Sequence, residues 1–290
     1  MEKKLKILSK KVNIYLNSYL SKFSSSDLTV PMKYGLFPGG KKIRSKIIFD
    51  VGSIFKLKKK DLFILAASVE AIHAYSLIHD DLPCMDDDKL RRGKPSTHIK
   101  FGESTAILAG NSLLTTAFEI LSDKNFKIDD KIKSKLINLL ARCSGQTGIA
   151  GGQYLDLNYE HKKVSRKKVT EMEVKKTGKL FSFCCMAPLI IKNKSRSEIK
   201  RFEHIGADIG LLFQVADDLI DSKGSLLLAG KKTGKDKKKG KATLISLLGQ
   251  KNTIKYAKSL IYKINKNLKR YGSKSRELSK TLEYILNRDK

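Results

Sequence analysis

The chain has 290 residues, of which 41% are hydrophobic, and its 59 basic against 29 acidic residues give a net charge of +30. This apolar share can form a substantial core, which excludes a wholly disordered chain. Five prolines are too few for the many turns of a sandwich or barrel. No apolar run reaches the roughly 18–20 residues that span a bilayer, and the four cysteines form no CxxC pair. We therefore expect a helical, cytoplasmic protein without stable membrane insertion.

The excess of positive charge is carried mostly by lysine, with 49 lysines against ten arginines spread from Lys3 to Lys290. A nucleic-acid binder is one reading of such a charge. Readout of bases, however, favours arginine forks and stacking aromatic residues, and the sequence concentrates neither. The densest stretch, residues 230–241, contributes only +6. We expect no nucleic-acid partner, and a genomic drift towards lysine codons is the simpler explanation.

Apolar residues recur at helical spacing in three long windows. In chain order these are residues 62–73, 106–121 and 205–220, and the last is apolar nearly all round. Breaks follow glycine and proline, at residues 38–40, 83, 145, 151–152 and after 224. No segment alternates like a strand beyond four or five residues, and no Ser/Pro/Gly-rich linker divides the chain. The sequence predicts an all-α protein with one domain over residues 1–290.

The first candidate site is the acidic stretch HDDLPCMDDDKLRRG at residues 79–93. Two carboxylates about 4 Å apart repel by about 4 kcal/mol at an effective dielectric of 20, so such groups must be solvated or share cations. Pro83 cannot continue a helix, which predicts that the helix ends near Asp80 or Asp81 and then turns. That turn could bring Asp80 and Asp86 to one ion. The alternative is a solvated acidic loop paired with its basic neighbours.

The second candidate site is FQVADDLIDSKG at residues 213–224. Asp217 and Asp221 are four residues apart, hence on one helical face about 6 Å apart along the axis, with Asp218 beside them. Carboxylates in so apolar a helix need cations or a wet cavity. Oxygen ligands without His or Cys indicate magnesium rather than zinc. A buried salt-bridge triad is the structural alternative, and a diphosphate bridged by magnesium ions is the ligand that both clusters favour.

With both clusters placed, the sequence closely resembles the short-chain trans-prenyl diphosphate synthases, in particular the bacterial farnesyl diphosphate synthase group. The resemblance rests on motifs in family order from about Gly39 to Thr243. They are GGKKIR (39–44), EAIHAYSLIHDDLPCMDDDKLRRG (70–93), GGQYLD (151–156), KKTGKL (175–180), FQVADDLID (213–221) and GKDKKKGKAT (234–243). It implies a helical bundle of the isoprenoid synthase type with a central active-site cavity.

The resemblance also implies a reaction and its residues. Isopentenyl diphosphate would be joined to an allylic diphosphate, dimethylallyl and then geranyl, giving mainly farnesyl diphosphate and releasing pyrophosphate. The isopentenyl diphosphate would be held by Lys41, Arg44, His73 and Arg92. Three magnesium ions would be held by Asp80, Asp81, Asp86, Asp217 and Asp221. The allylic diphosphate would contact Arg91, Lys176, Thr177, Gln214, Lys231 and Lys241, of which Lys176, Thr177, Gln214 and Lys241 would act in catalysis.

Product length is assigned by the same resemblance to Tyr75, which lies five residues before Asp80 and about 7.5 Å further down the helix. An aromatic residue there would close the tunnel that receives the growing chain; the alternative is an ordinary packed tyrosine. A homodimer is implied as well. The chain departs from the family pattern at four positions, which are Lys42, Ser45, Asn111 and Ser225.

Three other functions stay open at this point. Within the family, the product could be geranyl or geranylgeranyl diphosphate. From another class, His79 and Asp80 could begin the metal site of an HD-type phosphohydrolase, although that chemistry needs several histidines and the chain has five in all. A non-catalytic relative acting as a partner subunit is the third.

Overall fold

A computed structural model describes residues 1–23, 25–222 and 241–288, and within these ranges helices account for nearly all regular structure. The one described sheet is a hairpin of two-residue strands, β1 (Leu90–Arg91) and β2 (Lys94–Pro95). The all-α prediction is therefore confirmed. The chain divides into two compact units, one of residues 1–49 and 57–137 and the other of residues 50–56 and 138–290. The sequence shows no linker at these boundaries, and one domain over the whole chain stays a prediction.

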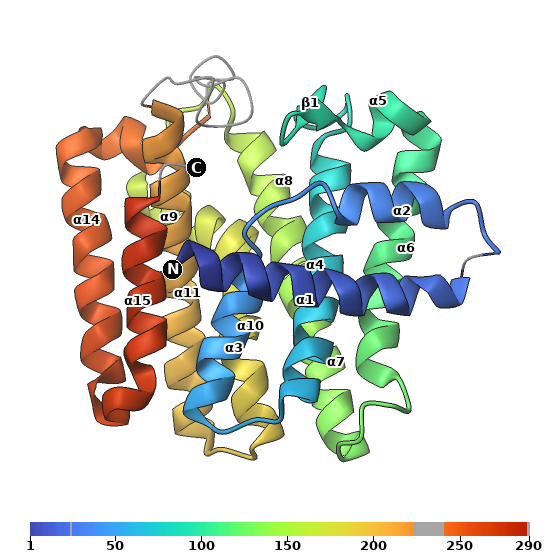
Figure 1. The fold of residues 1–290 in the computed structure, drawn as a ribbon. Helices are drawn as coiled ribbons and strands as arrows, with labels where there is room; N and C mark the ends of the chain where they lie inside the picture. The colour runs from blue at the N-terminus through green and yellow to red at the C-terminus, as the bar shows by residue number, and fades with distance from the viewer. Residues whose placement is uncertain (24, 223–240, 289–290) are drawn as a thin grey trace. The chain divides into compact units, whose positions relative to one another are not determined.

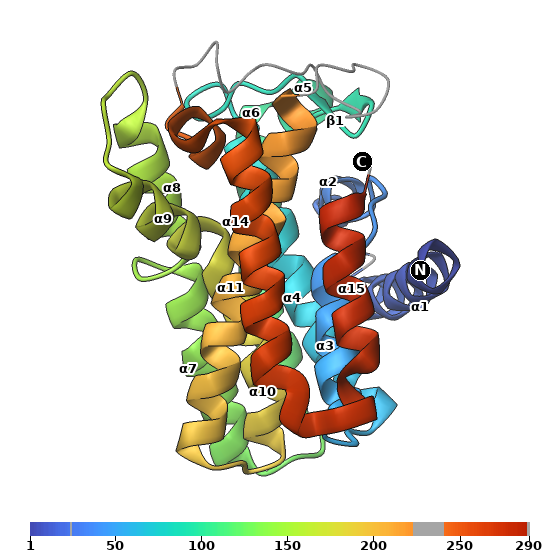
Figure 2. The same ribbon diagram turned by 90° about the vertical axis from the view of Figure 1, so that its left-hand side faces the viewer.

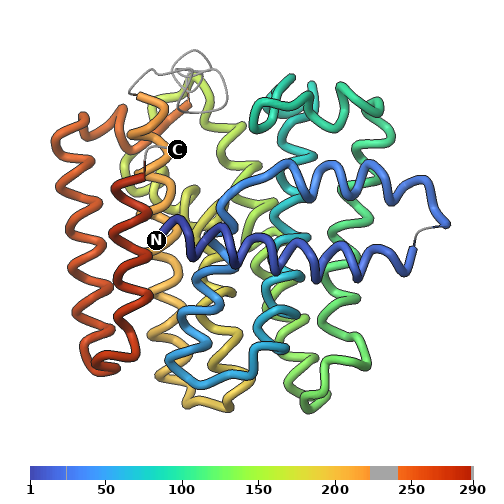
Figure 3. Tube along the Cα trace, viewed as in Figure 1, coloured from blue at the N-terminus to red at the C-terminus, as the bar shows by residue number. Residues whose placement is uncertain are grey.

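The first unit is built around two antiparallel helices, α4 (Lys59–Asp80) and α6 (Glu103–Ser122), which lie side by side (Figures 1 and 3). The Ser68 hydroxyl of α4 donates to the Ala117 carbonyl of α6 at 2.7 Å, so this buried polar group is satisfied. The other helices of this unit are α1 (Glu2–Leu20), η1 (Ser21–Phe23), α2 (Thr29–Leu36) and α5 (Thr97–Phe101). Helices α3 (Ile43–Ile54) and α7 (Asp130–Ser144) begin in this unit and end in the other.

Helix α4 is buried on all sides in its middle part, where every residue from Ile64 to Ile72 is buried away from solvent. Among the described residues it is the one helix long and apolar enough to cross a membrane. Of its most apolar window, 78% is buried inside the protein, as is usual for a core helix. The helix therefore forms a rigid core element, and the functional side chains on it have fixed positions.

The second unit is a bundle in which α11 (Arg196–Ser222) packs against α10 (Lys179–Ile191), α14 (Leu244–Leu268) and α15 (Arg276–Asn287). Figure 2 shows α11, α14 and α15 side by side. Residues 50–56 join this bundle: Thr281 donates to the buried Asp50 at 2.7 Å, and Phe55 packs edge-on against Phe202 and Tyr271. The remaining elements are α8 (Ile149–Tyr159), α9 (Arg166–Glu173), the π-helical turn η2 (Val174–Gly178) and η3 (Lys269–Ser275).

Candidate active site

The first acidic motif lies where α4 ends and the chain turns back on itself. The helix ends at Asp80, and the Asp86 amide donates to the Asp80 carbonyl at 2.8 Å. The Asp88 amide likewise donates to the Asp81 carbonyl at 3.1 Å. The predicted helix end and the turn at Leu82–Pro83 are therefore confirmed, and the backbones of Asp80 and Asp86 are brought together as that turn requires. Both side chains are partly exposed and can take an external ligand.

Asp81 is buried and has a different partner from its neighbour. The Arg91 Nε donates to its two carboxylate oxygens at 3.0 and 3.2 Å, and Arg91 Nη2 makes a further bond to Oδ1. Arg91 also lies 3.6 Å from the Asp88 carboxylate. Burial raises the pKa of Asp81, and the Arg91 hydrogen bonds oppose that shift. Asp81 and Arg91 thus brace the turn in this structure, and their expected contacts with metal and diphosphate stay predictions.

The glycine pair at residues 39–40 is explained by Arg92. Both glycines have positive φ angles, +104° and +110°, which strongly favour glycine. Arg92 Nη1 donates to the Gly39 carbonyl, and a Cβ on Gly40 would lie 2.3 Å from the same nitrogen. A side chain at Gly40 would therefore displace the guanidinium. This contact holds the segment that follows, Lys41 to Arg44, beside Arg92.

His73 stands in a cluster of positive charge. The Arg44 guanidinium lies 3.3 Å from His73 Nε2. Burial, and next the charge of Arg44, holds the pKa of His73 well below its usual range, so the imidazole is neutral at pH 7 and accepts from the guanidinium. Three further cations act in the same direction: Arg92, Lys42 and Arg91. Such a concentration of cations is suited to a polyanion such as a diphosphate.

Glu70 is a residue of this region that sequence reasoning missed. It is buried, its Oε2 lies 3.2 Å from the Lys42 ammonium, and its Oε1 accepts from the Ser45 hydroxyl at 2.7 Å. Burial alone would raise the pKa of Glu70, but Lys42, and after it the Ser45 hydroxyl, hold it below the usual range. Lys42 and Ser45 are two of the departures from the family pattern, and here they serve one carboxylate. Glu70 anchors α3 to α4 and thereby the loop that carries Lys41.

In the second unit, the π-helical turn η2 carries Lys176 and Thr177. The Thr177 hydroxyl donates to Gln214 Oε1 at 3.2 Å, and Gln214 Nε2 donates to Asp218 at 3.0 Å. This chain of hydrogen bonds brings together two predicted catalytic side chains, Thr177 and Gln214. A π-helical turn widens the helix locally and is frequent at functional sites.

Lys176 and Lys241 both contact Asp156, a residue for which the sequence alone predicts no role. Asp156 Oδ2 lies 2.5 Å from the Lys176 ammonium and 3.1 Å from that of Lys241. The carboxylate is only 5% exposed. Burial would raise the pKa of Asp156, but Lys176 and Lys241 together hold it below its usual range. Asp156 is the last residue of the motif GGQYLD, and its place in that motif is the sequence signal that could have identified it.

The second acidic motif lies near the end of α11, and its members differ in exposure. Asp218 is 3% exposed, whereas the Asp217 side chain is 47% exposed, so only Asp218 of these two is buried in the apolar helix. The Arg288 guanidinium forms an ion pair with Asp217 and lies 4.0 Å over the Phe213 ring. A cation therefore already stands at the carboxylate for which a metal role is predicted.

Metal binding can be judged from the donors themselves. Within the described ranges no three His, Cys, Asp or Glu side chains form a ready-made metal site. The donor set is carboxylate oxygen only, with Asp80 and Asp86 in one unit and Asp217 and Asp221 in the other. Magnesium fits such donors, because it uses one or two carboxylates and takes its remaining ligands from water and phosphate.

The contacts of His79 are not those of a metal ligand in an HD-type phosphohydrolase. Its Nε2 lies 3.1 Å from the Ile107 carbonyl, and its ring packs on Gly110, where a Cβ would be 2.2 Å from Nε2.

Tyr75 is buried, 9% exposed, with its ring edge-on to His79 at 5.7 Å between centroids. Burial, and next the Asp80 charge, raises the pKa of Tyr75 to about 12. Lys231 lies outside the described residues.

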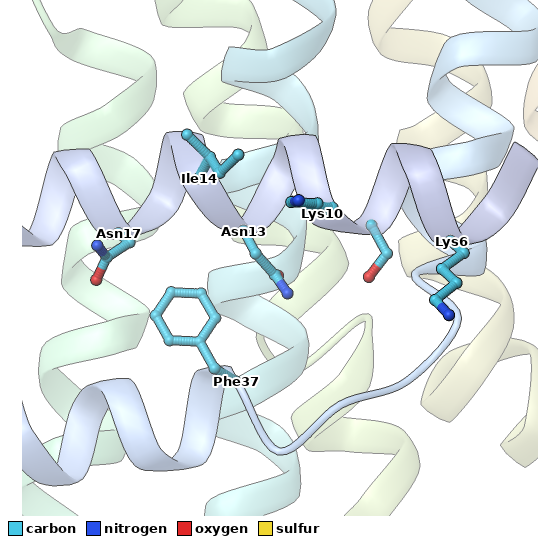
Figure 4. A pocket seen from close by; sticks show the side chains of 7 residues that line it. Lys6, Lys10, Asn13, Ile14, Asn17 and Phe37 are labelled. Atoms are coloured by element: carbon cyan, nitrogen blue, oxygen red, sulfur yellow. The ribbon is translucent and has the colours of Figure 1, made fainter.

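A groove of about 490 Å³ runs along α1 in the first unit (Figure 4). It is lined by Lys6, Ser9, Lys10, Asn13, Ile14, Asn17 and Phe37. None of these is a predicted site residue, although the Ser9 hydroxyl donates to the Gly40 carbonyl at 3.3 Å.

Comparison with known proteins agrees with these features. Residues 25–285 match the family model described as Polyprenyl synthetase. The chain is 40% identical over 273 residues to the farnesyl diphosphate synthase of Escherichia coli strain K12, covering 92% of this chain and 91% of that one. An FPP/GFPP synthase from Zymomonas mobilis superimposes with a TM-score of 0.87 at 34% identity, over 98% of this chain and all of that one.

A third relative was solved with ligands. The geranyltransferase of Helicobacter pylori, complexed with magnesium and isoprenyl diphosphate, matches with a TM-score of 0.79 at 31% identity, over 97% of this chain and 96% of that one. These matches define an all-α prenyl-transferring class of protein. The chain belongs to the polyprenyl synthetase family. The resemblance drawn from its motifs is confirmed, and the phosphohydrolase alternative has no support.

Proposed function

We propose that this chain is a farnesyl diphosphate synthase, which condenses isopentenyl diphosphate with dimethylallyl and then geranyl diphosphate. The observation that carries the proposal is the arrangement on α4, where a neutral His73 amid arginines and lysines lies seven residues before Asp80. Seven residues of helix separate them by about 10 Å on nearly one face. One helix thus presents a cationic site and an acidic site to two diphosphate substrates. Relatives named farnesyl diphosphate synthase support this product over geranyl or geranylgeranyl diphosphate.

The residues divide the work between the two substrates. Lys41, Arg44, His73 and Arg92 hold the isopentenyl diphosphate and orient its double bond. Asp80, Asp86 and Asp217, supported by Asp81 and Asp221, hold magnesium, for which we propose three ions. Arg91, Lys176, Thr177, Gln214, Lys231 and Lys241 contact the allylic diphosphate.

The reaction breaks the bond between the allylic carbon and its diphosphate oxygen, and joins that carbon to the terminal alkene carbon of isopentenyl diphosphate. Magnesium, when bound, neutralises charge on the departing pyrophosphate. Lys176 and Lys241 supply fixed positive charge to the same leaving group, and the Thr177 and Gln214 dipoles face the developing cation. The adduct then loses a proton to form the new double bond. We assign no side chain as its base, and the departing pyrophosphate is the acceptor that the chemistry provides.

The test is incubation with isopentenyl and dimethylallyl diphosphates and magnesium, with chain lengths resolved by chromatography. We expect fifteen-carbon product, and pyrophosphate release only when both substrates are present. Asp86→Asn should lower kcat by about 100-fold, because a metal ligand is lost. Asp87→Asn is the matched control, since Asp87 is exposed and its φ of +47° is tolerated by Asn. Phosphate release from nucleotides, or equal activity of both variants, would contradict the proposal.

We propose further that the protein is a cytoplasmic homodimer. Three large apolar side chains on α5 and α6 are well exposed: Ile99 at 51%, Ile107 at 42% and Leu108 at 55%. Exposed apolar side chains of this kind favour association with a second copy of the chain, which would bury them. Light scattering after gel filtration should give twice the chain mass, and Leu108→Glu should give the single-chain mass. A wild-type monomer would contradict this assignment.

A further inference from the structure

We propose that Asp156 is a positioning residue that sets the places of two lysine ammonium groups for the departing diphosphate. The inference rests on the proposed function, because Lys176 and Lys241 are assigned to that diphosphate. It adds a residue to which no catalytic or binding role has been given. Its basis is a single buried carboxylate oxygen with two ammonium groups, at 2.5 and 3.1 Å.

The two lysines come from segments far apart in the chain. Lys176 lies in η2, and Lys241 comes just before α14, 65 residues later. Since both nitrogens lie within 3.1 Å of one oxygen, they are at most about 5.6 Å from each other. Two like charges so close repel each other, and the Asp156 carboxylate between them offsets that repulsion. Two ammonium groups held this close together suit an anionic oxygen of the substrate.

The scaffold beneath Asp156 is built to hold the geometry. Gly152, one turn earlier on α8, packs against η2, and a Cβ there would lie 2.1 Å from the Lys176 backbone nitrogen. Helix α8 therefore contacts the backbone of η2 through Gly152 and the Lys176 side chain through Asp156. These two contacts fix the position of the Lys176 backbone and the position of its side-chain ammonium group.

Gln153 adds an independent indication of a ligand. It is three residues before Asp156 and so near the same face of α8. It is 5% exposed, and within the described ranges neither end of its amide has a hydrogen-bond partner. A buried amide without partners is costly, and an oxygen-rich ligand beside Asp156 would satisfy its NH2 group.

A second buried aspartate provides a matched control. Asp208 is 7% exposed and accepts from the Lys263 ammonium at 2.9 Å, within the same unit, and it carries no predicted role. Asp156→Asn and Asp208→Asn each remove the negative charge of a buried aspartate that pairs with lysine, and each keeps the shape of the side chain. A purely structural role predicts the same behaviour for both variants.

The readouts are kcat and KM for each substrate, the affinity for pyrophosphate with magnesium by calorimetry, and the melting temperature. We expect Asp156→Asn to lower kcat by about 30-fold and the pyrophosphate affinity by about 10-fold, with KM for isopentenyl diphosphate unchanged. Asp156→Glu should recover part of the loss. Asp208→Asn should lower the melting temperature and leave both kcat and affinity near wild type.

The sign of the affinity change separates positioning from simple charge. Removing a negative charge beside two lysines would by itself strengthen pyrophosphate binding, so higher affinity in Asp156→Asn would overturn the inference. Equal losses in Asp156→Asn and Asp208→Asn would also overturn it. An inactive wild-type enzyme would instead refute the proposed function, which keeps the two failures distinct.

Discussion

Glu70 offers the sharpest test of how the isopentenyl side of the candidate site is supported. The Lys42 and Glu70 side chains are 6% and 2% exposed, and their charged atoms lie 3.2 Å apart. At an effective dielectric of 20, their attraction is about 5 kcal/mol. Removing one member of a buried pair leaves the other charge uncompensated, at a cost of about 3–5 kcal/mol. We therefore expect Glu70→Gln to lower the free energy of unfolding by about 3–5 kcal/mol at pH 7.

The assay is urea denaturation of the wild type, Glu70→Gln, Lys42→Met and the double variant. The double variant should be more stable than the sum of the single effects predicts, by about 2 kcal/mol or more, because it leaves no lone charge. Ser45→Ala is the milder comparison, since it removes one hydrogen bond worth about 1–2 kcal/mol and leaves the ion pair. A loss below 1 kcal/mol in Glu70→Gln would refute the reasoning.

The pH dependence gives a second check on Glu70. Its folded pKa lies below the unfolded value of about 4.5, so the carboxylate stabilises the fold above that pH. This contribution is lost as the pH falls through the folded pKa. The difference in stability between wild type and Glu70→Gln should therefore be largest near neutral pH and shrink below about pH 4.5. A difference that stays constant down to pH 3 would contradict the lowered pKa.

Three further predictions follow from named contacts. Tyr75→Ala should let longer prenyl diphosphates accumulate, and Tyr75→Phe should not; an unchanged product length on chromatography would remove Tyr75 from this role. Gly152→Ala should lower stability by about 1–3 kcal/mol through overpacking against Lys176, whereas Gly249→Asn, with φ +73° and no atom within 4 Å of its added Cβ, should have little effect in thermal melts. Arg288→Gln should raise magnesium affinity about two- to five-fold in calorimetry with pyrophosphate, because a partly exposed ion pair at Asp217 no longer competes; an unchanged affinity would mean that Arg288 does not oppose the metal.

Local features of the first acidic motif could be predicted from the sequence. Pro83 predicts the helix end at Asp80, and the turn that follows brings the Asp86 backbone onto Asp80 within a few residues. Helical periodicity likewise predicts the core helices, because burial of one face leaves a repeating pattern. In these cases the physical cause and the residues it acts on are close together in the chain.

Partnerships between distant segments could not be predicted in the same way. Asp156 binds Lys241 across 85 positions, and Arg288 pairs with Asp217 across 71. The spacing of residues in the sequence does not indicate which charged residues will form an ion pair, because the whole fold determines which distant segments come together. Ser45 illustrates the point: it was noted only as a departure from the family pattern, yet its hydroxyl satisfies Glu70.

Helix α4 carries Glu70, His73, Tyr75 and Asp80 within its last three turns. Each residue advances the helix by 1.5 Å and rotates it by 100°, so inserting or deleting one residue would swing Asp80 away from the side on which His73 lies. The distance between the two proposed substrate positions, at His73 and Asp80, is therefore fixed by the helix. If Tyr75 closes the product tunnel as proposed, a change of side-chain size there would alter product length without disturbing the spacing of His73 and Asp80 along the helix.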